Sequence, residues 1–346
     1  SIPLYIGTYT RKEGHVDGKA LGIYRAVMNQ EDGSLNIEAS TDSIINPSFV
    51  LPSRDGKNLY AVSEIGKGEV VAYAKGDHQL TRLNTVPTGA PAPCHLAMDL
   101  TDRYLVTSNY MGGIVNVYRR GVDGQLNEVQ RIILNQTEDE KESHAHSATF
   151  SPDNRFVLIA DLGKDRIWQY QFDASSGKIT PNEKAYVEVA DGAGPRHFTF
   201  HPQGTFAYVI NELNSTVTAY EFDSLVGQLT EIQTLSTLPK DFDDNNSCAD
   251  IHPHPNGKFL YGSNRGHNSI VVYAIMDDGK LSIVEHISTG GDFPRNFALS
   301  PDGRFLYAAN QNSDNIRQFL INENDGRLTF HADVAVKTPV CLAFAN

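Results

Sequence analysis

The chain has 346 residues, 40% of them hydrophobic, which is enough material for a sizeable core. Its 29 Lys and Arg against 42 Asp and Glu give a net charge of −13, and so acidic a surface repels nucleic acid and anionic lipid. An anionic ligand would therefore need positive charge that is concentrated in one place.

The chain shows no targeting signal and no disulfide pattern. Its three cysteines are widely spaced and form neither a disulfide framework nor a zinc signature. The first residues lack the basic and apolar regions of a secretory signal, and no run of roughly 18 apolar residues predicts a membrane span. We therefore expect a cytoplasmic protein without a membrane or nucleic-acid partner.

A strand–turn–strand unit recurs along the chain. Its turn positions lie about 50 residues apart and are occupied by Gly56, Asp102, Asn154, Gly204, Gly257 and Gly303. These residue types suit two-residue hairpin turns with unusual backbone angles. An apolar strand precedes each turn and another follows it, as at 49–51 and 59–62, and two further strands complete each unit. Four strands in about 50 residues is the period of a propeller blade.

The two ends of the chain each hold half of a seventh unit. Residues 4–8 resemble the second strand at 306–310, and residues 340–345 resemble the first strand at 296–299. Each end lacks what the other end has. We predict an all-β fold in a single domain of residues 1–346, a seven-bladed β-propeller closed by pairing of the N- and C-terminal strands in one blade. Such closure hides sheet edges that would invite aggregation.

A polar residue follows the second strand of every blade. In such a blade the first strand leaves one face and the second returns to it, so these residues should lie at one mouth of the channel. We predict that four of them bind substrate, namely Asn109, Asp161, Asn211 and Asn264. Two alternatives are open: the ring solvates the channel and caps loops, or the oxygens of Asp161, Asn109 and Asn211 hold Ca²⁺ together with Glu64.

Charged side chains gather at the same mouth. His146 and Arg196 precede first strands, whereas Glu212 and Arg265 follow second strands. A guanidinium can grip a phosphate or carboxylate, a second can stabilise an oxyanion, and a carboxylate beside an imidazole can move protons. We predict that these four residues are catalytic and that Arg295, the counterpart of Arg196, binds substrate. The alternative is a purely structural Arg–Glu pair.

Other chemistry-bearing residues form weaker patterns. His144 and His146 alternate without a third ligand, so we predict no metal site. The cysteines lack a base partner in the sequence. The chain contains no Gly-x-Ser-x-Gly elbow and no dinucleotide fingerprint, so we predict no cofactor and direct attack by water on a reactive ester such as a lactone. Three histidines near the hairpin-turn end are expected to be structural: His201, His252 and His254.

One long segment resembles a known family. The segment comprises residues 194–202, which read Gly-Pro-Arg-His-Phe-Thr-Phe-His-Pro, and residues 208–215. It resembles the signature of the seven-bladed lactonase family. That family includes bacterial propeller-type 6-phosphogluconolactonases and fungal carboxy-cis,cis-muconate cyclases. Residues 144–148 and 151–155 also match, and the resemblance covers the whole chain. It implies that the proposed active-site His, Arg, Glu and Arg of the family correspond to His146, Arg196, Glu212 and Arg265, the last by blade position.

The resemblance also implies an activity. It points to a lactone hydrolase of the 6-phosphogluconolactonase type, acting on a small anionic lactone in the pentose phosphate pathway. A muconate-type lactonising cyclase that uses the same residues is an alternative, and so is a non-catalytic propeller that binds an anion or a peptide. We expect a monomer or a weak homo-oligomer.

Overall fold

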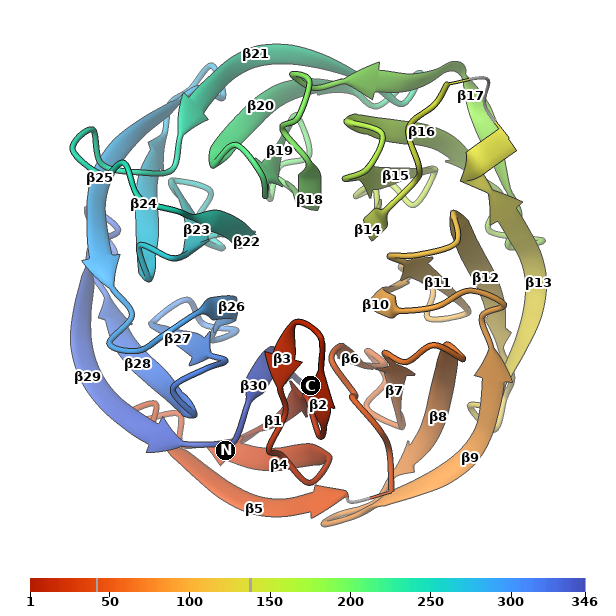
Figure 1. The fold of residues 1–346 in the computed structure, drawn as a ribbon, viewed down its shortest axis with the longest axis horizontal. Helices are drawn as coiled ribbons and strands as arrows, with labels where there is room; N and C mark the ends of the chain where they lie inside the picture. Colours follow the sequence, from red (N-terminus) through yellow and green to blue (C-terminus); the bar gives the residue numbers. More distant parts are fainter. Residues whose placement is uncertain (42, 137–138, 346) are drawn as a thin grey trace.

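A computed structural model describes residues 1–41, 43–136 and 139–345 as a ring of β-sheets around a central axis (Figure 1). Within these ranges the chain forms seven four-stranded sheets and one small two-stranded hairpin. The predicted all-β, seven-bladed propeller is therefore confirmed. The described part of the chain has no helix long and apolar enough to cross a membrane.

The blades are numbered along the chain, and each is given from its inner to its outer strand. Blade 1 consists of β6 (Val50–Pro52), β7 (Asn58–Ser63), β8 (Glu69–Lys75) and β9 (Leu80–Pro87). Blade 2 consists of β10 (Pro93–Met98), β11 (Tyr104–Asn109), β12 (Ile114–Arg120) and β13 (Leu126–Ile133). Blade 3 consists of β14 (Ala145–Phe150), β15 (Phe156–Asp161), β16 (Arg166–Phe172) and β17 (Ile179–Glu188). Blade 4 consists of β18 (Pro195–Phe200), β19 (Phe206–Asn211), β20 (Thr216–Asp223) and β21 (Gln228–Ser236). Blade 5 consists of β22 (Ser247–Pro253), β23 (Phe259–Arg265), β24 (Ser269–Ile275) and β25 (Leu281–Ser288). Blade 6 consists of β26 (Pro294–Leu299), β27 (Phe305–Asn310), β28 (Asn315–Ile321) and β29 (Leu328–Ala335). Blade 7 consists of β30 (Pro339–Phe344), β1 (Ile2–Thr8), β4 (Ile23–Met28) and β5 (Leu35–Thr41). The remaining elements are the hairpin of β2 (Lys12–Glu13) and β3 (Val16–Asp17) and the 3₁₀ turn η1 (Leu134–Gln136).

The core lies between neighbouring blades. Every residue of the second strands β7 and β27 is buried, whereas the outer strand β9 exposes several of its side chains. Tyr60 and Val62 of β7 pack with Leu105 of β11 in one buried cluster. Near-continuous apolar sequences in the second strands follow from burial on both faces.

The ring closes through the two ends of the chain. Strand β1 pairs antiparallel with β30, with Leu4 opposite Phe344 and Gly7 opposite Cys341. Figure 1 shows both termini in this blade. The predicted closure is confirmed, and the hairpin turns are as expected, because Gly56, Asp102 and their counterparts in blades 3 to 6 all have positive φ.

A β-bulge recurs near the start of the inner strands. In β18, for example, Pro195 pairs with Asn211 and His197 with Ile210, so Arg196 is left out of the ladder. Bulges bend a strand and re-aim a side chain. The residues skipped in this way are Cys94, His146, Arg196, Arg295 and Val340. The bulge therefore places three of the five residues predicted for the charged cluster at equivalent positions around the axis.

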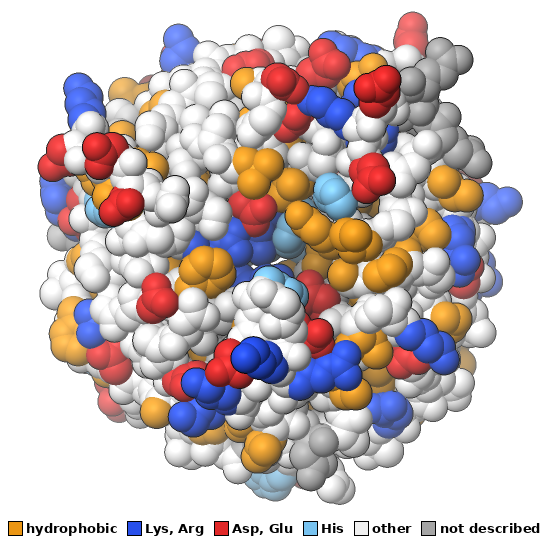
Figure 2. All heavy atoms as spheres, viewed as in Figure 1, with side chains coloured by type: hydrophobic (Ala, Val, Ile, Leu, Met, Phe, Trp, Pro, Cys, Tyr) orange, Lys and Arg blue, Asp and Glu red, His pale blue; other side chains and the backbone are white. Residues whose placement is uncertain are grey.

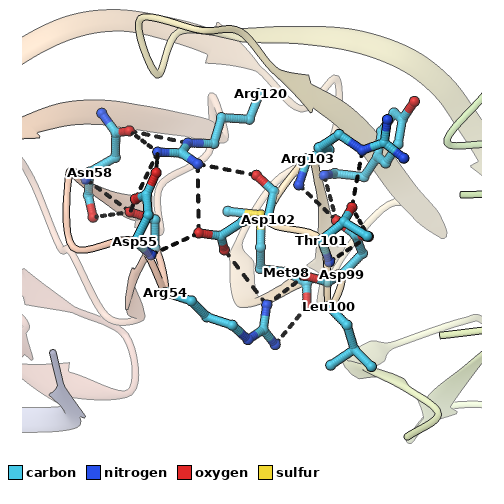
Figure 3. Close-up of polar contacts among 12 residues, drawn as sticks. Arg54, Asp55, Asn58, Met98, Asp99, Leu100, Thr101, Asp102, Arg103 and Arg120 are labelled. Atoms are coloured by element: carbon cyan, nitrogen blue, oxygen red, sulfur yellow. Dashed lines mark hydrogen bonds and ion pairs between the residues drawn. The ribbon is translucent and has the colours of Figure 1, made fainter. Parts of the chain in front are cut away.

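The hairpin-turn face carries a clamp between blades 1 and 2 (Figure 3). The Nη2 atom of Arg120 lies 2.8 Å from Oδ2 of Asp55, and its Nη1 atom lies 3.6 Å from Oδ2 of Asp102. Burial alone would raise the pKa of Asp55, but Arg120 and neighbouring donors lower it to about 2. The clamp joins the turns of two blades at the end of the ring opposite the charged cluster.

Candidate functional site

Three arginines and two glutamates meet where the bulges face the mouth of the channel. Arg196 and Arg295 lie on the inner strands β18 and β26, Arg265 ends β23, and Glu64 and Glu212 directly follow β7 and β19. Figure 2 shows a central hollow with Lys or Arg and Asp or Glu atoms at its floor and His atoms beside them. The local positive charge that an anionic ligand needs is therefore present.

Glu212 is the centre of one half of the cluster. Its Oε1 atom accepts a hydrogen bond from Nε of Arg196 at 3.2 Å and another from Nη2 of Arg265. The backbone holds it in place, because its N–H donates to the carbonyl of Gly194 at 2.7 Å and its carbonyl accepts from the N–H of Cys248 at 3.0 Å. Among the described residues nothing hydrogen-bonds to Oε2, and the side chain is 15% exposed. One carboxylate oxygen is therefore left for a ligand or water.

The two arginines keep Glu212 ionised. Burial alone would raise the pKa of this carboxyl, but Arg265 and Arg196 outweigh burial and hold the pKa below its usual value. Glu212 is consequently a carboxylate at neutral pH and can accept a proton.

Arg196 is almost wholly buried and its bonds fix the plane of its guanidinium. Besides its Nε bond to Glu212, it donates from Nη1 to the carbonyl of Ala249 at 2.7 Å. Burial, Arg265 and Arg295 lower its pKa to about 9, so it is still a cation at neutral pH. No described group accepts from Nη2.

Arg265 is held in the same manner. It donates from Nε to the carbonyl of Ser247 at 3.3 Å and from Nη2 to that of Cys248 at 2.8 Å, and it lies 4.9 Å from the centre of the Phe293 ring. Within the described ranges its Nη1 atom has no acceptor. Arg196 and Arg265 thus each offer one nitrogen to an anion.

Arg295 forms the other half of the cluster with Glu64. Its Nη2 atom lies 3.7 Å from Oε1 of Glu64, and its guanidinium lies 5.1 Å from the centre of the Tyr9 ring. The Oε2 atom of Glu64 is buried with no partner among the described residues. This ion pair is looser than the contact between Arg196 and Glu212, so Arg295 is the more available cation.

His146 is neutral at physiological pH. Burial lowers the pKa of its imidazole well below the usual value, and Arg196 and His197 lower it further. Its Nδ1 atom lies 3.7 Å from Sγ of Cys94, a neighbour that sequence spacing does not indicate. Burial raises the pKa of the Cys94 thiol, so this pair does not supply a thiolate.

The polar residues after the second strands form hydrogen bonds with their own blades and with the loops that connect the blades. The Nδ2 atom of Asn109 donates to the carbonyl of Ile114, that of Asn211 to Thr216 and Thr218, and that of Asn264 to the carbonyl of Thr237, while Asp161 accepts from Ser143, His144, Lys164 and Trp168. These contacts are the ones that the loop-capping alternative describes. Among the described residues no hydrogen bond or ion pair joins these four side chains to Arg196, Arg265 or Arg295, and the Oδ1 atoms of Asn109 and Asn211 are buried without a partner, so their role in substrate binding stays a prediction.

His197 and Asp250 are candidate functional residues that the sequence pattern did not single out. His197 and Asp250 line a cavity of about 500 Å³ on the hairpin-turn side of the channel, together with His95 and His252. His95 and His197 each directly follow a skipped residue, and Asp250 lies in the irregular stretch between Cys248 and Ile251 of β22, so the grouping is visible only once the strands are aligned. His201 and His254 lie elsewhere, against the carbonyls of Gly257 and Gly303. The described residues contain no group of three or more His, Cys, Asp or Glu side chains placed to hold a metal.

Comparison with known proteins gives consistent results. The family described as "Lactonase, 7-bladed beta-propeller" matches residues 3–344. A 6-phosphogluconolactonase from Bacillus subtilis (strain 168) is 35% identical over 99% of this chain and 98% of its own. The crystal structure of a putative 6-phosphogluconolactonase from Bacteroides fragilis has a TM-score of 0.90 at 33% identity, covering 100% of this chain and 98% of the other. A periplasmic gluconolactonase from Pseudomonas aeruginosa has a TM-score of 0.91 at 29% identity, covering 100% and 99%.

Proposed function

Because the chain belongs to the seven-bladed β-propeller lactonase family, we propose that it hydrolyses a small anionic sugar lactone, with 6-phosphogluconolactone as the first candidate. The observation that carries the proposal is the single oxygen of Glu212 shared by Arg196 and Arg265. This arrangement leaves one carboxylate oxygen and one nitrogen of each guanidinium for the reaction. Relatives named 6-phosphogluconolactonase support the choice of substrate.

The reaction needs one group that both takes and returns a proton. Glu212 and His146 are both unprotonated at neutral pH, so neither is a ready acid. Glu212 accepts a proton from the attacking water while the oxygen of that water bonds to the lactone carbonyl carbon. The free nitrogens of Arg196 and Arg265 stabilise the oxyanion. When the bond from carbon to the ring oxygen breaks, the protonated Glu212 returns its proton to that oxygen, and the product acid ionises to solvent.

The second half of the cluster takes the anionic group of the substrate. Arg295 pairs only loosely with Glu64, so it can turn to a phosphate without leaving a tight ion pair. In this proposal His146 and the buried, unpaired oxygen of Glu64 accept hydrogen bonds from sugar hydroxyls.

Acid release from 6-phosphogluconolactone tests this function. The rate with the protein should exceed the spontaneous rate, and carboxymuconate assayed side by side should not be cyclised. Cyclisation without lactone hydrolysis would assign the chain to the muconate cyclases, and absence of both activities would leave a binding propeller.

Three further properties stay predictions: a cytoplasmic location, a monomeric or weakly oligomeric state, and one domain over residues 1–346. The location needs a direct test, because the similar P. aeruginosa protein is described as periplasmic. Cell fractionation would provide that test.

A further inference from the structure

A row of hydrogen bonds runs from Arg196 to Asp250. Besides its bond to the carbonyl of Ala249, Nη1 of Arg196 lies 3.3 Å from Nε2 of His197, and Nδ1 of His197 lies 2.8 Å from Oδ1 of Asp250. His197 is 8% and Asp250 is 2% exposed. The other oxygen of Asp250 accepts from Nδ2 of Asn296 at 2.7 Å and lies 2.8 Å from Nε2 of His252. The row is therefore buried and joined to a second set of contacts.

The partners of His197 permit only one form of its ring. Asp250 is ionised, since burial would raise its pKa but His252 and His197 together hold it far below the usual value. A carboxylate only accepts and a guanidinium only donates, so Nδ1 carries the hydrogen and Nε2 presents its lone pair to Arg196. Burial and Arg196 lower the pKa of His197 to about 4, so this neutral form persists at neutral pH.

We propose that His197 and Asp250 are positioning residues that hold the Arg196 guanidinium for binding of the lactone. The inference rests on the proposed function and adds to it the groups that aim its central arginine. Glu212 occupies Nε, and the carbonyl of Ala249 and the lone pair of His197 occupy Nη1. As far as the described residues go, Nη2 alone is left for a ligand, and these three acceptors set its direction. Asp250 acts through His197, because it fixes which nitrogen of the ring carries the hydrogen.

Asp250→Asn is the sharpest test. The amide keeps the size of the side chain but can donate to Nδ1, which moves the hydrogen of His197 to Nε2, where it faces the N–H of Arg196. We expect kcat/KM for 6-phosphogluconolactone to fall roughly 10- to 100-fold, as for a lost hydrogen bond to a charged group. His197→Gln retains an acceptor near Arg196, so its kcat/KM should stay within about threefold of the wild-type value. The kcat/KM of His197→Phe should fall as far as that of Asp250→Asn. His252→Gln is the matched control, since the glutamine amide can still donate to Oδ2 of Asp250, His197 still holds the pKa of that carboxyl low, and both contacts of the row remain.

Two readouts separate positioning from a merely structural role. Long-range ¹H–¹⁵N spectra, with His197 assigned from the His197→Gln variant, should show hydrogen on Nδ1 in the wild type and on Nε2 in Asp250→Asn. Calorimetric binding of 6-phosphogluconate reports the arginines without turnover, and should weaken in Asp250→Asn and His197→Phe but not in His252→Gln. If wild type hydrolyses no lactone while binding still follows this order, the proposed function fails and the positioning role stands. Equal behaviour of His197→Gln and His197→Phe, or hydrogen on Nε2 in the wild type, would overturn the proposal.

Discussion

Arg196 and Arg265 donate hydrogen bonds to the same atom, Oε1 of Glu212. The two arginines belong to neighbouring blades 4 and 5, so a single carboxylate oxygen joins those blades at the mouth of the channel. All three side chains are largely buried. The contact therefore serves stability and prepares an ionised base, and these two roles can be separated by experiment.

Glu212→Gln should abolish most of the activity. The amide keeps the size and hydrogen bonding of the side chain but cannot accept a proton from water. Loss of a general base typically costs about 10²- to 10⁴-fold, and we expect kcat for 6-phosphogluconolactone to fall by that order. Glu31→Gln, on the exposed surface, is the control for a charge change alone. A Glu212→Gln enzyme with normal kcat would move the base to His146.

The same substitution should also destabilise the protein in a pH-dependent manner. Removing one partner of a buried ion pair costs up to about 3–5 kcal/mol. The pKa of Glu212 lies below its ordinary value of 4.5 in the fold, so its ionised form stabilises the fold above that pH and the contribution is lost as the pH falls through the lower folded value. In urea titrations the difference in unfolding free energy between wild type and variant should be full at neutral pH and shrink under acid conditions. A difference that grows on acidification would contradict this account.

Arg295 and Arg196 should differ in substrate dependence. Arg295→Gln should reduce kcat/KM more for 6-phosphogluconolactone than for glucono-1,5-lactone, because only the former carries the phosphate that Arg295 is proposed to hold. Arg196→Lys keeps the charge but loses the planar fork of the guanidinium. If Arg196 stabilises the oxyanion, this substitution should lower kcat/KM equally for the two substrates. The reverse pattern would exchange the two roles.

Deleting residues 340–346 should destabilise the whole ring. The deletion removes most of β30, including the buried side chains of Val340, Cys341 and Leu342, and exposes the edge of β1. At about 1.5–3 kcal/mol for each large buried side chain, the free energy of unfolding should fall by at least several kcal/mol. A circular permutant that links the two termini and opens an exposed hairpin elsewhere is the control and should stay folded. An unchanged melting temperature after truncation would show that closure contributes little.

Arg120→Met should affect stability and spare activity. It removes charge-assisted hydrogen bonds to Asp55 on the face opposite the charged cluster, a loss of about 1.5–3 kcal/mol. Lys280→Met breaks an exposed ion pair and should cost less than about 0.5 kcal/mol. We expect both variants to retain kcat within about twofold. A large loss of kcat in Arg120→Met would show that the clamp influences the charged cluster at the opposite face.

The ring was predictable because its signals are local and repeated. Turn residues with positive φ, apolar second strands and complementary chain ends each follow from short segments of sequence. It was harder to foresee which side chains after the second strands point into the channel. Asn211 and Glu212 are adjacent, and successive side chains of a strand point to opposite sides, so a shift of one residue decides which of them meets the channel. The repeat aligns both positions and does not distinguish them.

The remaining contacts are set by packing between blades. Cys94 contacts His146, and Glu64 contacts Arg295, because bulges re-aim the skipped side chains. Glu64 and Arg295 belong to blades 1 and 6, which are separated by blade 7. Such pairs lie far apart in the chain and leave no periodic trace. The row from Arg196 to Asp250 was missed for the same reason.

The most direct measurement compares 6-phosphogluconolactone hydrolysis by the wild type and by Arg265→Gln, followed as acid release above the spontaneous rate. The account predicts a wild-type rate well above the spontaneous one and a loss of at least about 10²-fold in kcat/KM for the variant, because removing one oxyanion donor typically costs that much. A wild-type rate equal to the spontaneous rate, or an Arg265→Gln enzyme as active as wild type, would contradict it.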